Sequence, residues 1–401
     1  MSRVGEKNRH SLVAGYPTID STFNLIFSND KLGPLTIKSG YLVVKAGTPV
    51  TVAVDGEEYY TRMEFRENVD LQDGCYHIPK GSKVTLKESW RYIQETIPGA
   101  LELIPKEVKP GGGVINSLIA ISQYTELQNV HGLFSLSKGE EHILNYLKEC
   151  GCPEENIHTY SIDTQPRINI VVQSARCGNE IIEDRIVIKH PPGQPSINHN
   201  FEELYNTRWD KILLNGSKFK DEIMHIAKCE KGELTVVFTS STAKYAELLL
   251  PVTSTYISNG EELGIITGIG TISSSEPDAD GILKAVESLK KNRIPEVIVT
   301  IGERGSIGVD RENEVYLVSA CKVSPCNTNG AGDAYTAGFF ASSGILPERM
   351  VNATKVAATH LAKRPPEEPP DIIRLGCISG LRPDKLEKCL YSQGNFGTQT
   401  I

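Results

Sequence analysis

The second half of the chain alternates between short β-branched segments and longer segments with apolar residues at helical spacing. Strands separated by helices of this kind pair in parallel within one sheet that is covered on both faces. Ligands of such sheets bind beyond the carboxyl ends of the strands. The pattern predicts strands at residues 235–239, 253–258, 296–301 and 315–318, and helices at 243–250, 282–289, 331–342 and 351–363.

The N-terminal part of the chain is dominated by strand patterns. Alternating valines at 50–54 precede Asp55-Gly56 and an aromatic segment at 59–65, which predicts a tight hairpin. Further strands are expected at 35–44, 130–136, 168–173 and 186–189, and helices at 111–124 and after Ser137, which we expect to cap the second of them. A small sheet with one solvent-exposed face should therefore accompany the larger unit.

Composition argues against several classes of protein. The 401 residues carry a net charge of −8, without the basic excess of proteins that bind nucleic acids or anionic membranes. The apolar runs are shorter than the roughly 18–20 residues that span a bilayer, and residues 1–10 are too polar for a secretory signal. The nine cysteines are odd in number and lack zinc-ligand spacing. We therefore expect reduced thiols and a cytoplasmic protein without nucleic-acid or membrane partners.

Residues 327–333 carry the strongest chemical signal, N-T-N-G-A-G-D, at the start of a predicted helix. Small residues there leave the backbone N–H groups of Gly330, Ala331 and Gly332 open to an anion, which the helix dipole also favours. Asp333 in the first turn could accept a proton from a hydroxyl group while those N–H groups neutralise a phosphoryl group. The alternative is structural: the glycines permit a tight loop, and Asp333 caps the helix.

This segment resembles the C-terminal signature of the ribokinase family, the PfkB carbohydrate kinases, which also contains the adenosine kinases. The family pattern is D-T-x-G-A-G-D, and Thr328 and residues 330–333 match it. Asn329 matches a variant common among adenosine kinases. Asn327 departs from the pattern, because the family usually has Asp there.

Other segments resemble the family's motifs in the same order. Asp20 occupies the position of an Asp that binds sugar hydroxyls, and P-G-G-G-V-I-N-S places Gly111, Gly112 and Asn116 towards the sugar. N-G-E-E, at residues 259–262, resembles the family's N-x-x-E motif, which organises magnesium and phosphate. T-I-G-E-R-G, at residues 300–305, resembles the family's strand end that lies over the nucleotide. Each segment also has a purely structural interpretation. Asp20 could be a turn residue, N-G-E-E could be a helix cap, and Arg304 could be a solvated side chain.

The resemblance implies an α/β fold: a ribokinase-like α/β/α sandwich with a mostly parallel central sheet and a small β lid. The implied large domain comprises residues 11–22, 105–163 and 205–392, the lid comprises 23–104 and 164–204, and 393–401 form a flexible tail. Asp20 and Gly111 are 91 positions apart, more than the family usually has. This insertion either enlarges the lid or is a surface decoration. P-loop, protein-kinase and dinucleotide-binding motifs are absent from the sequence.

The resemblance further implies an ATP-dependent kinase that phosphorylates a hydroxymethyl group of a sugar or nucleoside. Asp333 would be the base, beside the N–H groups of Gly330, Ala331 and Gly332. The ATP-binding residues would be Asn259, Thr300, Gly302, Gly305 and Thr328, with Glu262 holding Mg²⁺ through water. A monomer or a lid-mediated homodimer would be typical.

Two questions stay open at this stage. A nucleoside site would need aromatic walls, for which Tyr16, Tyr41 and Phe134 are candidates. The alternative to a kinase is a catalytically weak nucleotide- or sugar-binding protein of the same fold, which Asn327 and the insertion suggest. The retained Asp333 and N-x-x-E argue against that alternative.

Asn327 generates a prediction about monovalent cations. The resemblance implies that in related kinases the Asp at this position belongs to a loop that holds potassium beside the anion site. Hard cations favour charged oxygen ligands. We predict little or no activation by potassium, whereas Asn327→Asp should create a potassium dependence. Initial rates in potassium, sodium and a bulky organic cation at fixed ionic strength test this. A several-fold stimulation of the natural protein would instead mean that carbonyl oxygens hold the ion.

Overall fold

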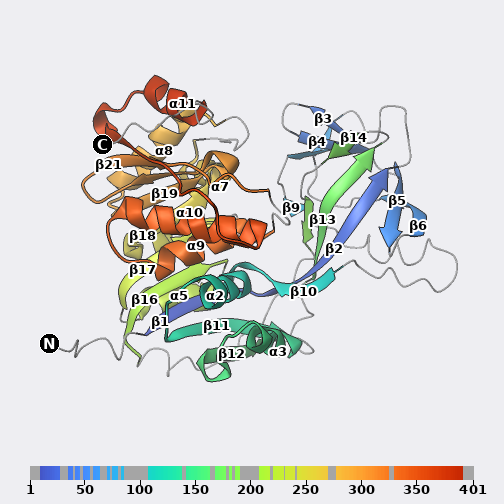
Figure 1. Ribbon diagram of the computed structural model, residues 1–401, viewed down its shortest axis with the longest axis horizontal. Coiled ribbons are helices and arrows are strands. Elements are labelled where there is room, and N and C mark those ends of the chain that lie inside the picture. Colours follow the sequence, from blue (N-terminus) through green and yellow to red (C-terminus); the bar gives the residue numbers. More distant parts are fainter. Residues whose placement is uncertain are drawn as a thin grey trace.

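The computed structural model gives two regions, a large sheet covered by helices and a second group of strands (Figure 1). Nothing is described outside the following ranges: 10–27, 35–38, 41–45, 48–54, 57–63, 70–72, 75–79, 83–84, 107–137, 141–162, 168–177, 180–182, 186–189, 207–216, 220–229, 231–239, 242–269, 277–324 and 329–391. In most of the second region only the backbone is described.

The main sheet has ten strands, and the first seven in its spatial order run parallel to their neighbours. The other three pair antiparallel at one edge. The order is β12 (Ile157–Ile162), β11 (Val130–Ser137), β1 (Ser11–Gly15), β16 (Trp209–Asn215), β17 (Lys231–Val237), β18 (Thr255–Asn259), β19 (Glu296–Thr300), β20 (Ser306–Val309), β21 (Glu314–Val318) and β22 (Ile372–Cys377).

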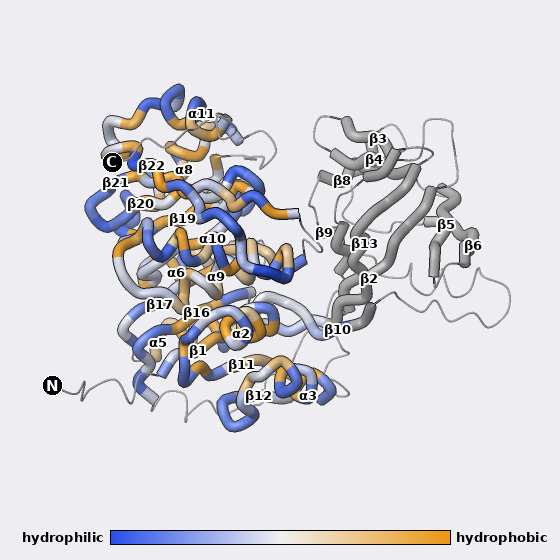
Figure 2. The backbone as a smooth tube through the Cα atoms, in the orientation of Figure 1, coloured by the Kyte–Doolittle hydropathy of each residue, from blue (hydrophilic) through white to orange (hydrophobic). Residues whose placement is uncertain are grey.

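Helices cover both faces of this sheet because alternate strand residues point to opposite sides. Val13 and Leu213 pack with the helices of one face: α2 (Gly113–Tyr124), α3 (His142–Glu149) and α9 (Ala331–Ala341), with α10 (Leu346–Ala362) packed beside α9. Leu12 and Ile212, their neighbours in sequence, pack with those of the other: α5 (Lys220–Lys228), α6 (Ala246–Leu249), α7 (Gly260–Thr267), α8 (Ala279–Lys291) and α11 (Pro383–Tyr391). Figure 2 shows hydrophobic stretches on strands of the main sheet and on helices such as α2 and α9 that pack against it. The expected α/β/α sandwich is confirmed.

The second region contains two smaller sheets. One has the order β6 (Glu57–Met63), β5 (Thr48–Val54), β2 (Thr18–Phe27), β13 (Ile168–Cys177), β15 (Ile186–Lys189) and β9 (Lys83–Val84), with β10 (Glu107–Gly111) paired to β2 and β14 (Glu180–Ile182) paired to β13. The other has the order β3 (Leu35–Lys38), β4 (Tyr41–Lys45), β8 (Cys75–Pro79) and β7 (Asp70–Gln72). Strands β5 and β6 pair antiparallel with Val54 opposite Glu57, as the hairpin prediction requires.

Some local predictions were wrong. Ser137 does not cap α3, because it is the last residue of β11 and Glu141 holds the cap position. The helix expected at 243–250 is divided into η2 (Ala243–Tyr245), α6 and η3 (Leu250–Val252). Pro251 lacks an N–H group to continue the α-helical hydrogen bonds at that point.

Two strands of the second region begin inside stretches that were expected to belong to the large domain. Strand β2 begins at Thr18, inside the stretch expected in the large domain, and β10 lies within another such stretch. The expected tail, 393–401, lies outside the described residues. The boundaries themselves stay a prediction.

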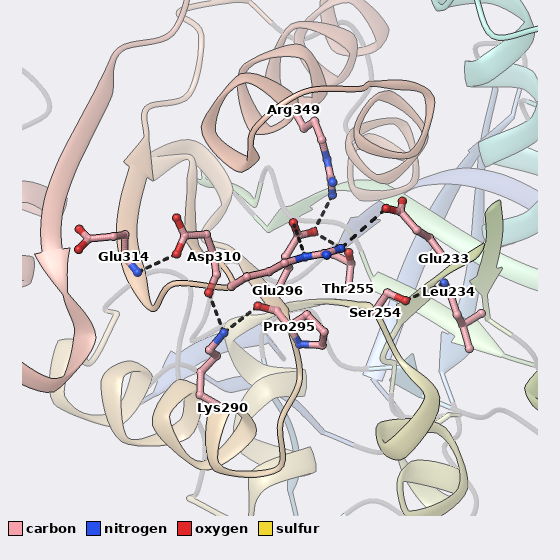
Figure 3. Close-up of polar contacts among 11 residues, drawn as sticks. Glu233, Leu234, Ser254, Thr255, Lys290, Pro295, Glu296, Asp310, Glu314 and Arg349 are labelled. Atoms are coloured by element: carbon pink, nitrogen blue, oxygen red, sulfur yellow. Dashed lines mark hydrogen bonds and ion pairs between the residues drawn. The ribbon is translucent and has the colours of Figure 1, made fainter. Parts of the chain in front are cut away.

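A buried ion pair ties α10 to the amino ends of β18 and β19 (Figure 3). Glu296, the first residue of β19, accepts hydrogen bonds at Oε2 from Arg349 Nη2 and Thr255 Oγ1, both at 2.8 Å. The Arg349 guanidinium also lies 4.0 Å from the centre of the Phe339 ring. The side chains of Arg349 and Glu296 are only 10% and 9% exposed, and Arg311 Nε lies 4.0 Å from the other carboxylate oxygen, Glu296 Oε1.

We expect Arg349→Met to lower the free energy of unfolding by about 3 kcal/mol, because the buried Glu296 carboxylate then keeps only the Thr255 hydroxyl and Arg311, which is 56% exposed and 4.0 Å away. Arg374→Met is the matched control, since its ion pair with Glu314 lies largely in solvent and should contribute about 0–1 kcal/mol. Urea unfolding of both variants measures the difference. Equal losses would show that burial of the Arg349 pair does not matter.

Candidate functional site

The described residues leave space beside Gly332 in the first turn of α9. Gly330 precedes the helix with φ 80° and ψ 5°, a left-handed conformation that favours glycine. Among the described residues, a Cβ atom added at Gly332 would meet no atom within 4 Å beyond its own helix and chain neighbours. The first N–H groups of a helix have no partners within the helix. The structure therefore has the local features that an anion site requires at this helix start.

Asp333 lies in that first turn, and two side-chain amides hold its carboxylate. Asn116 Nδ2, from the first turn of α2, donates to Oδ2 at 2.8 Å. Asn215 Nδ2, from the last residue of β16, donates to Oδ1 at 3.0 Å. The two helix starts and the strand end thus meet at one carboxylate, at the edge of the sheet where ligands of parallel sheets bind.

Glycine is required where α2 begins, because backbones approach closely there. A Cβ atom at Gly112, which has φ 87°, would lie 2.6 Å from the carbonyl oxygen of Tyr16. One at Gly113 would lie 2.4 Å from Asn215 Oδ1. Gly111 ends β10 and joins the second region to this point. The glycine run expected to face a sugar therefore also has a packing role.

Asn259 and Glu262 form a capping box at the start of α7. Asn259 Oδ1 accepts from the Glu262 N–H at 2.8 Å, and Glu262 Oε2 accepts from the Asn259 N–H at 3.4 Å. The prediction that N-G-E-E forms a helix cap is therefore correct. The cap places both side chains at the carboxyl end of β18. Among the described residues, no three His, Cys, Asp or Glu side chains form a group that could hold a metal ion.

The T-I-G-E-R-G segment lies next to this capping box. Thr300 pairs with Asn259 in the sheet, and η4 (Gly302–Arg304) follows it. Gly305 has φ 90°, and a Cβ atom there would lie 2.0 Å from the carbonyl oxygen of Val318. At Gly302, with φ 54°, it would meet no atom within 4 Å. Gly305 is required for packing, whereas Gly302 leaves open space beyond β19.

Several expected site residues have side chains that lie outside the described part of the chain. Asp20 lies in β2, opposite Lys109 of β10, and its side chain is not described. Thr328 and Asn327 lie outside the described residues, and of Tyr41 only the strand backbone is described.

Three side-chain expectations need correction. Phe134 is 0% exposed and Tyr16 is 3% exposed, both within the core, so neither forms the wall of an open pocket. Arg304 is half-buried rather than solvated, because its guanidinium lies 4.6 Å from the centre of the Tyr391 ring.

Two residues of this arrangement, Asn215 and His360, were not predicted from the sequence. His360 Nε2 donates to the carbonyl oxygen of Asn329 at 2.7 Å, beside the left-handed Gly330. Burial lowers the pKa of His360 below its usual value, although the Asp333 charge acts in the opposite direction. Asn215 had a signal, since it is a polar residue at the end of the apolar run 212–214. His360 had none, because nothing in its helix pattern points to a turn 31 residues earlier.

Comparisons with known proteins agree with this geometry. The family model for pfkB family carbohydrate kinases matches residues 105–344. Deoxyribokinases from Salmonella typhi and Salmonella typhimurium are each 34% identical over 106 residues, which is 26% of this chain. The match covers only 33% of the length of each relative.

Two solved structures show the same fold. Ribokinase from Thermotoga maritima superimposes with a TM-score of 0.54 at 16% identity, over 96% of this chain and 99% of that chain. The tetrameric inhibited form of phosphofructokinase-2 from Escherichia coli gives a TM-score of 0.55 at 14% identity, over 97% and 100%. In the part of the chain that the structure describes, no helix is both long and apolar enough to cross a membrane.

The open space at Gly332 gives a test of the anion site. Gly332→Ala should not lower thermal stability, because among the described residues the added methyl group would meet no atom beyond its own helix, but it should weaken nucleotide binding by obstructing the N–H groups. Gly330→Ala should instead lower stability by about 1–2 kcal/mol through its left-handed backbone. Thermal melting and calorimetric titration with ATP measure both effects. Unchanged ATP affinity in Gly332→Ala would exclude an anion from this helix start.

Proposed function

Because this chain belongs to the pfkB family of carbohydrate kinases, we propose that it transfers the γ-phosphoryl group of ATP to a hydroxymethyl group of a small sugar. One observation carries the proposal: the Asp333 carboxylate is held by two amides beside an open helix N-terminus. A base and an anion site at one point are what phosphoryl transfer to an alcohol requires.

The proposed step uses these groups together. Asp333 accepts the proton of the acceptor hydroxyl, whose oxygen forms a bond to the γ-phosphorus. The bond from the γ-phosphorus to the β–γ bridging oxygen breaks, and ADP leaves with the electron pair. The N–H groups of Gly330, Ala331 and Gly332 stabilise the negative charge on the transferred group. Positioning and electrostatics therefore supply most of the rate.

Mg²⁺, when bound with ATP, would supply a bridge between phosphate oxygens and neutralise their charge. Glu262 is our candidate for holding its hydration shell, because the capping box fixes this carboxylate at the end of β18. Asn259, Thr300, Gly302, Gly305 and Thr328 remain our candidates for binding ATP. The second region would cover the site and exclude water, which would otherwise accept the phosphoryl group.

We favour a sugar over a nucleoside as acceptor. Phe134 and Tyr16 are enclosed in the core, so two of the three aromatic candidates for a base-binding wall are removed. The relatives named as deoxyribokinases and the structure named as a ribokinase point in the same direction. Asp20, Gly111, Gly112 and Asn116 are our candidates for contacting this sugar. The oligomeric state, a monomer or a lid-mediated homodimer, stays a prediction.

We expect Asp333→Asn to lower kcat roughly 10²–10⁴-fold, because the amide cannot accept the hydroxyl proton, while ATP affinity stays largely intact. A coupled assay of ADP release should be run against ribose, deoxyribose, fructose, adenosine and inosine. Asp384→Asn on the exposed side of α11 is the control.

Two results would contradict the proposal. Normal turnover of Asp333→Asn would remove this carboxylate from the reaction. Sugar binding by the natural protein without any ADP release would support the alternative of a binding protein.

A further inference from the structure

Asn215 is a buried amide surrounded by groups that accept hydrogen bonds. It is the last residue of β16, and only 2% of it is exposed. Its Nδ2 atom lies 3.0 Å from Asp333 Oδ1, 3.0 Å from Ser117 Oγ and 3.2 Å from the carbonyl oxygen of Gly113. One NH₂ group thus connects the base, α2 and the sheet.

The chemistry of these neighbours determines which way the amide faces. A carboxylate and a peptide carbonyl only accept hydrogen bonds, so an NH₂ group must face them. With the amide turned around, Oδ1 would lie against two acceptors, one of them charged. The donor direction therefore follows from the partners.

Close backbone packing holds Asn215 in place. A Cβ atom added at Gly15 of β1 would lie 2.0 Å from the Asn215 carbonyl oxygen. One added at Gly113 would lie 2.4 Å from its Oδ1. The side chain is thus enclosed between a strand and a helix start, and sites built on such rigid elements are more precise than sites on loops.

We propose that Asn215 is a positioning residue for the phosphoryl transfer, which orients the Asp333 carboxylate towards the acceptor hydroxyl. This inference rests on the proposed function. Asn116 holds Oδ2 and Asn215 holds Oδ1, so rotation of the carboxylate breaks both hydrogen bonds. A carboxylate has about four lone-pair sites, and two are occupied by the amides. The others remain in fixed directions for the incoming hydroxyl proton.

The first test replaces the amide by an apolar group of similar size. We expect Asn215→Leu to lower kcat about 10²-fold, the cost of a small misplacement of a reacting group. The KM values for ATP and sugar should stay close to those of the natural protein. Ser117→Ala is the matched control: it removes another buried partner of the same amide but leaves the contact with Asp333, so its kcat should be retained.

The second test is a double-mutant cycle with Asp333→Asn. A residue that acts only through Asp333 should have no further effect on kcat once that carboxylate is gone. Additive losses in the double variant would show a purely structural role and overturn the inference. A natural kcat in Asn215→Leu would overturn it as well.

The same cycle separates this inference from the function it rests on. If Asp333→Asn keeps its turnover, the proposed base is wrong; if only the Asn215 variants keep theirs, the positioning role alone is wrong. Should Asn215→Leu not fold, Asn215→Ser provides the variant, because the shorter side chain fits the space without reaching Asp333. Thermal melting confirms that each variant is folded before its kinetics are compared.

Discussion

Two helices begin at the same edge of the main sheet, and the Asp333 carboxylate lies between their first turns. Each helix start carries a partial positive charge and unpaired N–H groups. Bringing two of them together is unfavourable unless negative charge lies nearby. Asp333 supplies one such charge, and a bound phosphate would supply more. Glycines stand at both helix starts: an added Cβ atom would meet the Tyr16 backbone at Gly112 and the Asn215 side chain at Gly113, and Gly330 has a left-handed backbone.

The groups that stabilise the sheet and the groups proposed to act on substrate lie at its opposite edges. Glu296 and Thr255 begin their strands, and with Arg349 they hold the amino edge against α10. Asn215 and Asn259 end theirs, at the carboxyl edge. The same parallel strands thus carry apolar residues in the middle, a buried ion pair at one end and polar side chains at the other. Residues at one end of the strands can therefore be replaced without requiring replacements at the other end.

Much of the fold could be predicted from periodicity, because buried parallel strands such as β19 and amphipathic helices such as α8 have distinct patterns. The anion site at Gly330 and Asp333 also had a local signal. The contacts of Asp333 with Asn116 and Asn215 did not, since their partners are 217 and 118 residues apart. Local pattern likewise does not show that Phe134 is enclosed by α2 and α3, because an aromatic residue in a strand suits a core and a pocket equally well. Such facts depend on tertiary packing.

The antiparallel pair of β2 and β10 places Thr18 opposite Gly111 and Asp20 opposite Lys109. The long insertion therefore leaves the large region after β1 and returns to it before α2, and its two ends are already joined by the pairing of β2 with β10. The entropy of closing a loop grows only slowly with its length, roughly as its logarithm. Chain can thus be gained or lost between these strands at little cost to the rest of the protein. Insertions between β2 and β10 can therefore change the second region during evolution, while the carboxyl ends of the main-sheet strands stay the same.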